Sequence, residues 1–127
     1  MNSVDFIKDF YEIRKLKDPE LLRPKIAQNV VWREPSVGDH MGELVGVDNV
    51  IDMISRAMET TGGSFSLAVA ETIEVAEHCA AVIEWSAEKG EKTINGKEMA
   101  IFSVVDEQIV FAQFLPSNID NDNDFWA

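Results

Sequence analysis

Apolar residues recur every three to four positions at the start of the chain, which predicts helices. In residues 4–16 they form one stripe, made up of Phe6, Phe10, Ile13 and Leu16. Asp18 can cap a second helical segment, because Pro19 then occupies the first helical position. We expect that segment to be short, because Pro24 would interrupt the hydrogen bonding of a longer helix.

A short apolar strand and a third helix follow. Residues 30–34 read as a strand that stops before Pro35, since proline cannot donate to a sheet ladder. Residues 38–46 contain three glycines and predict a loop. Asp48 can then cap a helix that ends at residues 62–63, both glycines.

From residue 64 onward apolar and polar positions alternate, which predicts a meander of four strands. The expected strands are 64–77, 79–88, 97–105 and 109–115, with a loop near Gly90 or Asn95-Gly96 between the second and the third. Glu71 interrupts the apolar parity of the first of these strands. A β-bulge, a solvated strand position or a carboxylate facing a cavity would each explain it.

The last two strands are apolar on both parities, so both faces of the sheet should be covered. Three helices can cover only one face. We therefore expect a second copy of the chain to cover the other, as a homodimer through the outer sheet face. The competing explanation is a C-terminal segment that folds back over the sheet.

The 127 residues suit a single domain, assigned here to residues 1–116, followed by an acidic tail at 117–127. Phe125 and Trp126 in that tail either dock on the body or a partner, or belong to a frayed terminus. The lone cysteine, Cys79, excludes an internal disulfide. No signal or membrane-spanning pattern is present, so we expect a cytoplasmic protein.

The formal charge of −12 argues against nucleic-acid and anionic-membrane partners. The basic run 14–17, Arg-Lys-Leu-Lys, is interpreted as a solvated helix end whose charges complement the helix dipole. We find no metal-ligand cluster, phosphate loop or nucleophilic triad, and expect no cofactor.

The order of these elements resembles the nuclear transport factor 2-like superfamily over residues 4–115, and most closely its SnoaL-like and ketosteroid isomerase-like branch. The local features are residues 30–35 (Val-Val-Trp-Arg-Glu-Pro) ahead of the glycine loop, Gly46 before the third helix, and residues 106–110 leading the last strand. The resemblance implies an α+β fold. In it a cone-shaped, curved antiparallel sheet packs on three N-terminal helices as a cystatin-like roll, encloses an apolar cavity, and often dimerises through its outer face.

The resemblance also implies a catalytic position. Isomerase-like members carry the general base in an acidic-proline pair at the strand end, which is Glu34 here. They hold the enolate with a tyrosine of the first helix and a protonated aspartate of the meander. By spacing these positions fall on Phe10, with Tyr11 one step around the helix, and near Ala100, so the chain departs from that oxyanion pattern.

The candidate catalytic residues are Glu34 and His40, the histidine lying in the adjacent glycine loop. The alternatives are an ion pair of Glu34 with Arg33 or Arg56, and a solvent-facing His40. The candidate pocket-lining residues, which ordinary core packing would explain equally well, are Phe10, Tyr11, Trp32, Met53, Met58, Trp85, Phe102 and Phe114.

These features predict a SnoaL-like enzyme that uses cofactor-free acid–base chemistry on a small apolar ligand. Isomerisation, cyclisation, dehydration and hydrolysis all remain open. The alternative is a non-catalytic ligand-binding or protein-assembly dimer of the same fold.

Overall fold

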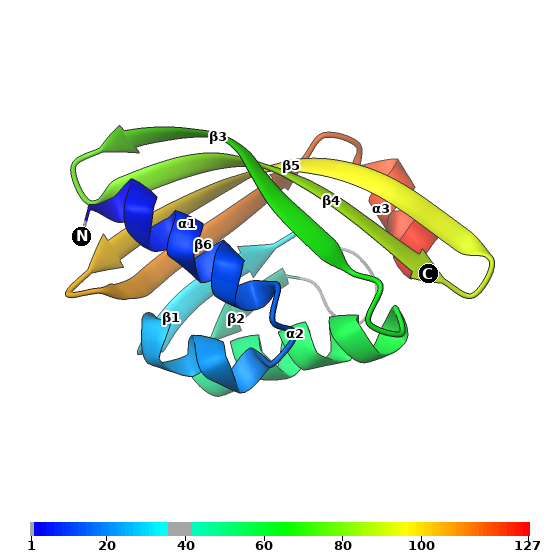
Figure 1. Ribbon diagram of the computed structural model, residues 1–127, viewed down its shortest axis with the longest axis horizontal. Helices are drawn as coiled ribbons and strands as arrows, with labels where there is room; N and C mark the ends of the chain where they lie inside the picture. The colour runs from blue at the N-terminus through cyan, green and yellow to red at the C-terminus, as the bar shows by residue number, and fades with distance from the viewer. Residues whose placement is uncertain (1, 36–41) are drawn as a thin grey trace.

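A computed structural model describes residues 2–35 and 42–127, and it confirms the predicted α+β architecture (Figure 1). The elements are α1 (Ser3–Arg14), the 3-10 helix η1 (Pro19–Lys25), β1 (Ile26–Glu34), β2 (Gly42–Val45), α2 (Val47–Thr60), β3 (Ser66–Val75), β4 (His78–Lys89), β5 (Lys92–Val105), β6 (Gln108–Pro116) and α3 (Ile119–Trp126). Within the described residues, none of the helices combines the length and apolarity needed to cross a bilayer.

The six strands form one sheet in the order β2-β1-β6-β5-β4-β3. β1 runs parallel to β6, and the other neighbours are antiparallel, so the sheet is mixed rather than wholly antiparallel. Helices α1, η1 and α2 lie on one side of the curved sheet, and α3 lies at the end away from the N-terminus (Figure 1). This arrangement brings the ends of α1, β1 and α3 toward one region.

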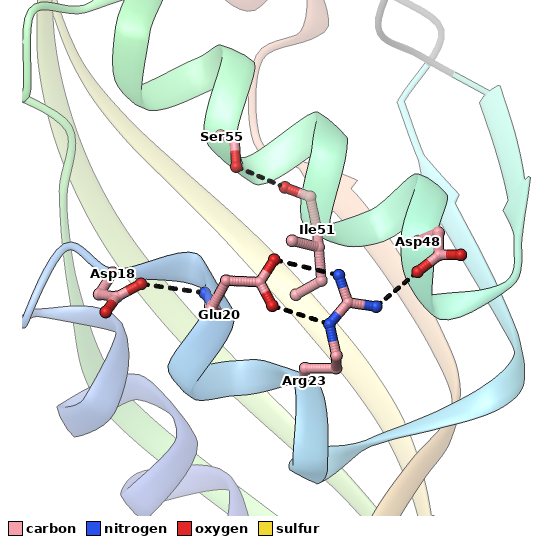
Figure 2. Close-up of polar contacts among 6 residues, drawn as sticks. All are labelled: Asp18, Glu20, Arg23, Asp48, Ile51 and Ser55. Carbon is pink, nitrogen blue, oxygen red and sulfur yellow. Dashed lines mark hydrogen bonds and ion pairs between the residues drawn. The ribbon is translucent and has the colours of Figure 1, made fainter.

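One of the two predicted helix caps is present, and the other is not. Asp18 caps η1 as predicted, accepting from the Glu20 amide at 3.2 Å. Asp48 does not cap α2, whose N-cap is Gly46. Asp48 instead accepts a hydrogen bond from Arg23, and this ion pair connects η1 to the first turn of α2 (Figure 2). Arg23 also binds Glu20 of η1 at 2.8 Å.

The predicted loop 38–46 was wrong for its second half. Gly42–Val45 forms β2, which pairs with the end of β1 so that Glu34 faces Gly42. Four residues are too few to show an alternating pattern, and the pairing with β1 decides their conformation. Residues 36–41 lie outside the described part of the chain.

Of the two positions predicted for the turn between β4 and β5, the structure has the turn at the earlier one, near Gly90. Gly90, with a φ of 62°, and Glu91 make the turn. Asn95 and Gly96 lie inside β5, where Gly96 stands opposite Trp85. A Cβ atom on Gly96 would lie 2.2 Å from Trp85 Cε2, so the indole needs a glycine at that position.

Glu71 is exposed and marks a register shift in the β3–β4 pairing, which is the β-bulge alternative. Beyond the bulge Ile73 and Val75 turn outward and are 69% and 66% exposed. Met99 and Leu115 on β5 and β6 are also exposed, at 44% and 45%. Helix α3 leaves these four side chains uncovered, and the homodimer through this face stays a prediction.

The core lies between the helices and the sheet and continues to the C-terminal helix. Phe10, Trp32 and Phe102 are fully buried, with ring centroids 6.3 to 6.4 Å apart. Phe125 of α3 is 3% exposed and packs 6.2 Å from Trp85. The segment 117–127 is therefore docked on the body of the protein, not frayed.

Candidate functional site

A cavity of about 60 Å³ lies where α1, α2, β1, β5 and α3 meet, and we call it the acidic cavity. Its polar wall consists of Arg14, Glu34, Glu98 and Asp122. Its apolar wall consists of Pro35, Met53, Ala57, Phe65, Leu67, Trp85, Phe114 and Trp126. The volume admits a few waters or the reacting end of a ligand.

Glu34 enters the cavity because of its place in β1. Val30 and Trp32 point into the core, and Glu34 continues their parity at the last residue of the strand, beside Pro35. The Trp32 indole Nε1 donates a 2.8 Å hydrogen bond to Glu34 Oε1. Burial raises the pKa of Glu34, while that hydrogen bond and the charge of Arg14 oppose the rise.

Glu98 is the second carboxyl group of the cavity and comes from β5. It lies on the inner face of the strand, on the same parity as the fully buried Ala100 and Phe102. Burial, followed by the charge of Glu34, raises the pKa of Glu98 to about 8, against the opposing charge of Arg14. At pH 7 the protonated form of Glu98 therefore outnumbers the carboxylate by about ten to one.

Different neighbours act on the pKa values of these two carboxyl groups, although burial raises both. The Trp32 hydrogen bond favours the anion of Glu34, and that anion disfavours a second negative charge on Glu98. Two carboxyl groups in different electrostatic surroundings thus face one cavity. Such a pair can take a proton at one atom and supply one at another.

Asp122 and Arg14 complete the polar wall. Asp122 of α3 is 7% exposed, and burial raises the pKa of its carboxyl group. Arg14 ends α1, and its guanidinium carbon lies 5.8 Å from the centroid of the Phe65 ring. Among the described residues that line it, the cavity therefore has one cation and three acidic groups.

Three of the aromatic rings on the apolar side of the cavity pack against one another. Phe65 stacks on Trp85 at 5.2 Å, and Trp126 lies 5.9 Å and 6.1 Å from the two rings. Gly96 on the neighbouring strand leaves room for the Trp85 indole. The C-terminal helix thus supplies both an acid and a ring to the wall.

Tyr11 lies close to this site without lining the acidic cavity. Its side chain is 1% exposed, and its hydroxyl has no hydrogen-bond partner among the described residues. Burial, and then the charge of Glu98, raise the pKa of Tyr11 above its usual value. A buried hydroxyl without a partner is destabilising by about 1–3 kcal/mol, which marks it as a donor that a ligand could use.

The structure gathers some of the sequence-predicted site residues and separates others. Glu34, Met53, Trp85 and Phe114 all line the acidic cavity. Phe10, Trp32 and Phe102 do not line it, because their rings pack against one another in the core. Met58 is partly buried against the core and does not line the cavity either.

The alternative ion pairs of Glu34 do not form. Arg33 binds Glu43 at 2.9 Å, and Arg56 binds Asp52 at 2.7 Å. His40, the second catalytic candidate, lies outside the described residues.

Sequence reasoning missed Arg14, Glu98 and Asp122. Glu98 had a readable signal, since it is the charged residue on a strand face otherwise made of Ile94, Gly96, Ala100 and Phe102. Asp122 had none, because its acidic segment reads as a solvated tail. Within residues 2–35 and 42–127, His, Cys, Asp and Glu side chains form no group of three that could hold a metal ion.

Comparison with known proteins identifies the fold and no more. No family profile and no curated protein sequence matches the chain. The structure is similar to Bal32a from a soil-derived mobile gene cassette, with a TM-score of 0.93, 16% identity, and coverage of 98% of this chain and 96% of that one.

Two further solved structures agree. A protein of unknown function with a cystatin-like fold from Xanthomonas campestris has a TM-score of 0.92 and 21% identity, covering 100% and 99% of the two chains. A putative SnoaL-like polyketide cyclase from Jannaschia sp. CCS1 has a TM-score of 0.80 and 9% identity, covering 98% of this chain and 92% of that one.

Proposed function

We propose that this protein, which has the nuclear transport factor 2-like (cystatin-like) fold, is a cofactor-free acid–base enzyme acting on a small apolar molecule. The observation that carries the proposal is the pair of partly buried carboxyl groups, Glu34 and Glu98, that face one cavity and have raised pKa values with different causes beside burial. Isomerisation, cyclisation, dehydration and hydrolysis can all use such a pair as general base and general acid. The polyketide cyclase among the structural neighbours makes cyclisation one of these options at the level of fold alone.

The two groups take complementary roles in the proposed chemistry. Glu34, as the carboxylate, removes a proton from a carbon atom of the bound substrate or from a water molecule beside it. Glu98, as the acid, donates a hydrogen bond or its proton to the oxygen on which negative charge develops. The catalytic step then leaves a proton on Glu34, which returns it to the product or to solvent. Where Glu98 has given up its proton, it takes one back from the product oxygen or from solvent.

The apolar wall supports this assignment. Phe65, Trp85 and Trp126 place apolar surface beside the carboxyl groups, and electrostatic interactions next to apolar walls are stronger than in bulk water. The Trp32 hydrogen bond fixes the Glu34 carboxylate, so little reorganisation is needed at the moment of proton transfer.

The first experiment identifies a ligand and then measures proton transfer directly. Mass spectrometry of the purified protein searches for a bound small molecule, and related ketones are then incubated with the protein in D₂O. We expect the wild type to exchange α-protons of at least one ketone, as followed by ¹H NMR. Glu34→Gln should lower the exchange rate by about a hundredfold or more.

A matched control separates the base from general damage. Glu43→Gln alters another glutamate of the β1–β2 hairpin, exposed and paired with Arg33, and should leave the exchange rate unchanged. Equal rates for the wild type and Glu34→Gln would contradict the catalytic role of Glu34. A cavity that binds hydrophobic molecules, with binding and exchange indifferent to Glu34→Gln, would favour a non-catalytic binding protein.

The second candidate function, a protein-assembly dimer, is favoured by the outer sheet face. Ile73, Val75, Met99 and Leu115 are exposed there, on three different strands. A second copy packed on this face would remove them from water. The two candidate functions use opposite faces of the sheet and can coexist.

A further inference from the structure

A second hollow of about 260 Å³ adjoins the acidic cavity, and we call it the basic hollow. Its walls come from the end of α1, the chain just beyond it and the start of β3. They are lined by Tyr11, Arg14, Lys15, Lys17, Phe65, Ser66 and Leu67.

The charge of this hollow is opposite to that of the protein as a whole. Three of its lining residues, Arg14, Lys15 and Lys17, are cations, and no carboxylate lines it in the part of the chain that the structure describes. The whole chain has 23 acidic and 11 basic residues. A site of local positive charge on such a protein attracts anions selectively, because the surrounding surface repels them.

The three cations differ in the hydrogen bonds and ion pairs that they already make. Lys15 is bound to Glu12 at 2.8 Å, and the Lys17 ammonium donates to the backbone oxygens of Gly63 and Phe65. Arg14 makes no side-chain hydrogen bond or ion pair with the described residues; its guanidinium lies over the Phe65 ring. Its planar fork of donors is therefore available to an incoming carboxylate or phosphate.

Tyr11, another lining residue of the hollow, carries a second unused donor. The Tyr11 side chain lines the hollow, is 1% exposed, and carries a hydroxyl with no hydrogen-bond partner among the described residues. The attraction of cations to the end of a helix explains why Arg14 and Lys15 occur there. It does not explain a buried hydroxyl without a partner on the same wall.

The two cavities share Arg14, Phe65 and Leu67 as lining residues. The acidic cavity has room for about 60 Å³, and the basic hollow adds about 260 Å³ beside it. A molecule whose reacting end occupies the acidic cavity would therefore extend most easily past Phe65, toward the three cations.

We propose that the basic hollow binds the anionic end of the ligand, a carboxylate or phosphate monoester, while the apolar end of the same ligand enters the acidic cavity. This inference rests on the proposed function, since it names the substrate class of the same site. The Arg14 guanidinium donates hydrogen bonds to the anion, and the Tyr11 hydroxyl donates a further one. Lys17 adds positive charge at the rim.

The test compares two fluorescent probes that share one aromatic scaffold. 1-Anilinonaphthalene-8-sulfonate carries an anionic group, and N-phenyl-1-naphthylamine lacks it. We expect the wild type to bind the sulfonate at least about tenfold more tightly, with an affinity that falls as salt is added. Arg14→Gln should reduce sulfonate affinity about tenfold or more and change affinity for the neutral probe less than about threefold.

Lys8→Gln is the matched control, because Lys8 is an exposed cation of the same helix that does not line the hollow. Lys15→Gln is the second variant, expected to weaken sulfonate binding less than Arg14→Gln. Retained binding of the neutral probe shows that each variant is folded. Displacement of the sulfonate by hexanoate, hexyl phosphate and hexanol then distinguishes a carboxylate site from a phosphate site, with hexanol expected to displace least.

Two results would overturn the proposal. One is equal affinity of the wild type for both probes, and the other is an equal effect of Arg14→Gln and Lys8→Gln on sulfonate binding. Either result, found together with D₂O exchange that depends on Glu34, would refute the basic hollow alone and leave the acid–base function standing.

Discussion

Glu98→Gln should stabilise the protein at alkaline pH, because it removes a buried acidic group. The folded protein raises the pKa of Glu98 from 4.5 to about 8. Between these values the folded state keeps a proton that the unfolded chain has released. The free energy of unfolding of the wild type therefore falls as pH rises through this window. Below pH 4.5 both states are protonated and Glu98 has no effect.

The magnitude follows from the pKa change. One pKa unit corresponds to about 1.4 kcal/mol. Relative to pH values below 4.5, the titration of position 98 therefore lowers the free energy of unfolding by about 3 kcal/mol at pH 7 and about 5 kcal/mol above pH 8. A glutamine at position 98 carries no titratable proton. The advantage of Glu98→Gln over the wild type should thus grow from near zero at pH 4.5 to these values.

Urea unfolding followed by tryptophan fluorescence at pH 4.5, 7 and 9 measures this difference. Glu91→Gln serves as control, because Glu91 is exposed in the β4–β5 turn, and its offset from the wild type should stay within about 0.5 kcal/mol. A Glu98→Gln offset that does not change with pH, or a variant less stable than the wild type at pH 9, would refute the assignment of Glu98 as a buried, protonated acid.

Three further predictions concern the cavity and the outer sheet face. Glu34→Gln should lower the pKa of Glu98, because the substitution removes the negative charge of Glu34. ¹³C NMR of the Glu98 carboxyl carbon measures this pKa, and an unchanged value would contradict the coupling of the two groups. Gly96→Ala should displace Trp85 and destabilise the fold by about 1–3 kcal/mol. The near-ultraviolet circular dichroism should change with the position of the indole, and an unchanged spectrum would show that the strand shifts instead. Light scattering should find a dimer for the wild type and a monomer for Met99→Glu, while a monomeric wild type would exclude the outer-face homodimer.

Much of the architecture could be predicted because it depends on local patterns. The helical stripe of residues 4–16 and the alternating strands from residue 64 are properties of neighbouring residues, and the structure has them within a few positions. Glu34 could be placed at a strand end because proline follows it. Asp48 shows the limit of such signals, since its pairing with Arg23 depends on a contact between two separate elements.

The candidate site depends on distant contacts, and that is why sequence patterns recovered only part of it. Glu34 and Glu98 stand 64 positions apart, and Asp122 belongs to a segment that reads as an acidic tail. Only folding brings these three acids and Arg14 to one cavity. The pKa of Glu98 is likewise a product of tertiary structure, because burial and the neighbouring charge of Glu34 determine it.

The sequence by itself determined most of the element types, but not those of β2 and α3, together with the strand-end position of Glu34 and the two-sided apolar strands, since periodicity and backbone chemistry act over a few residues. The tertiary structure decided which acids share a cavity, which rings pack as core, and that the C-terminal helix forms part of the wall. The physical reason is that proton affinity and cavity shape arise from the exclusion of water by side chains far apart along the chain.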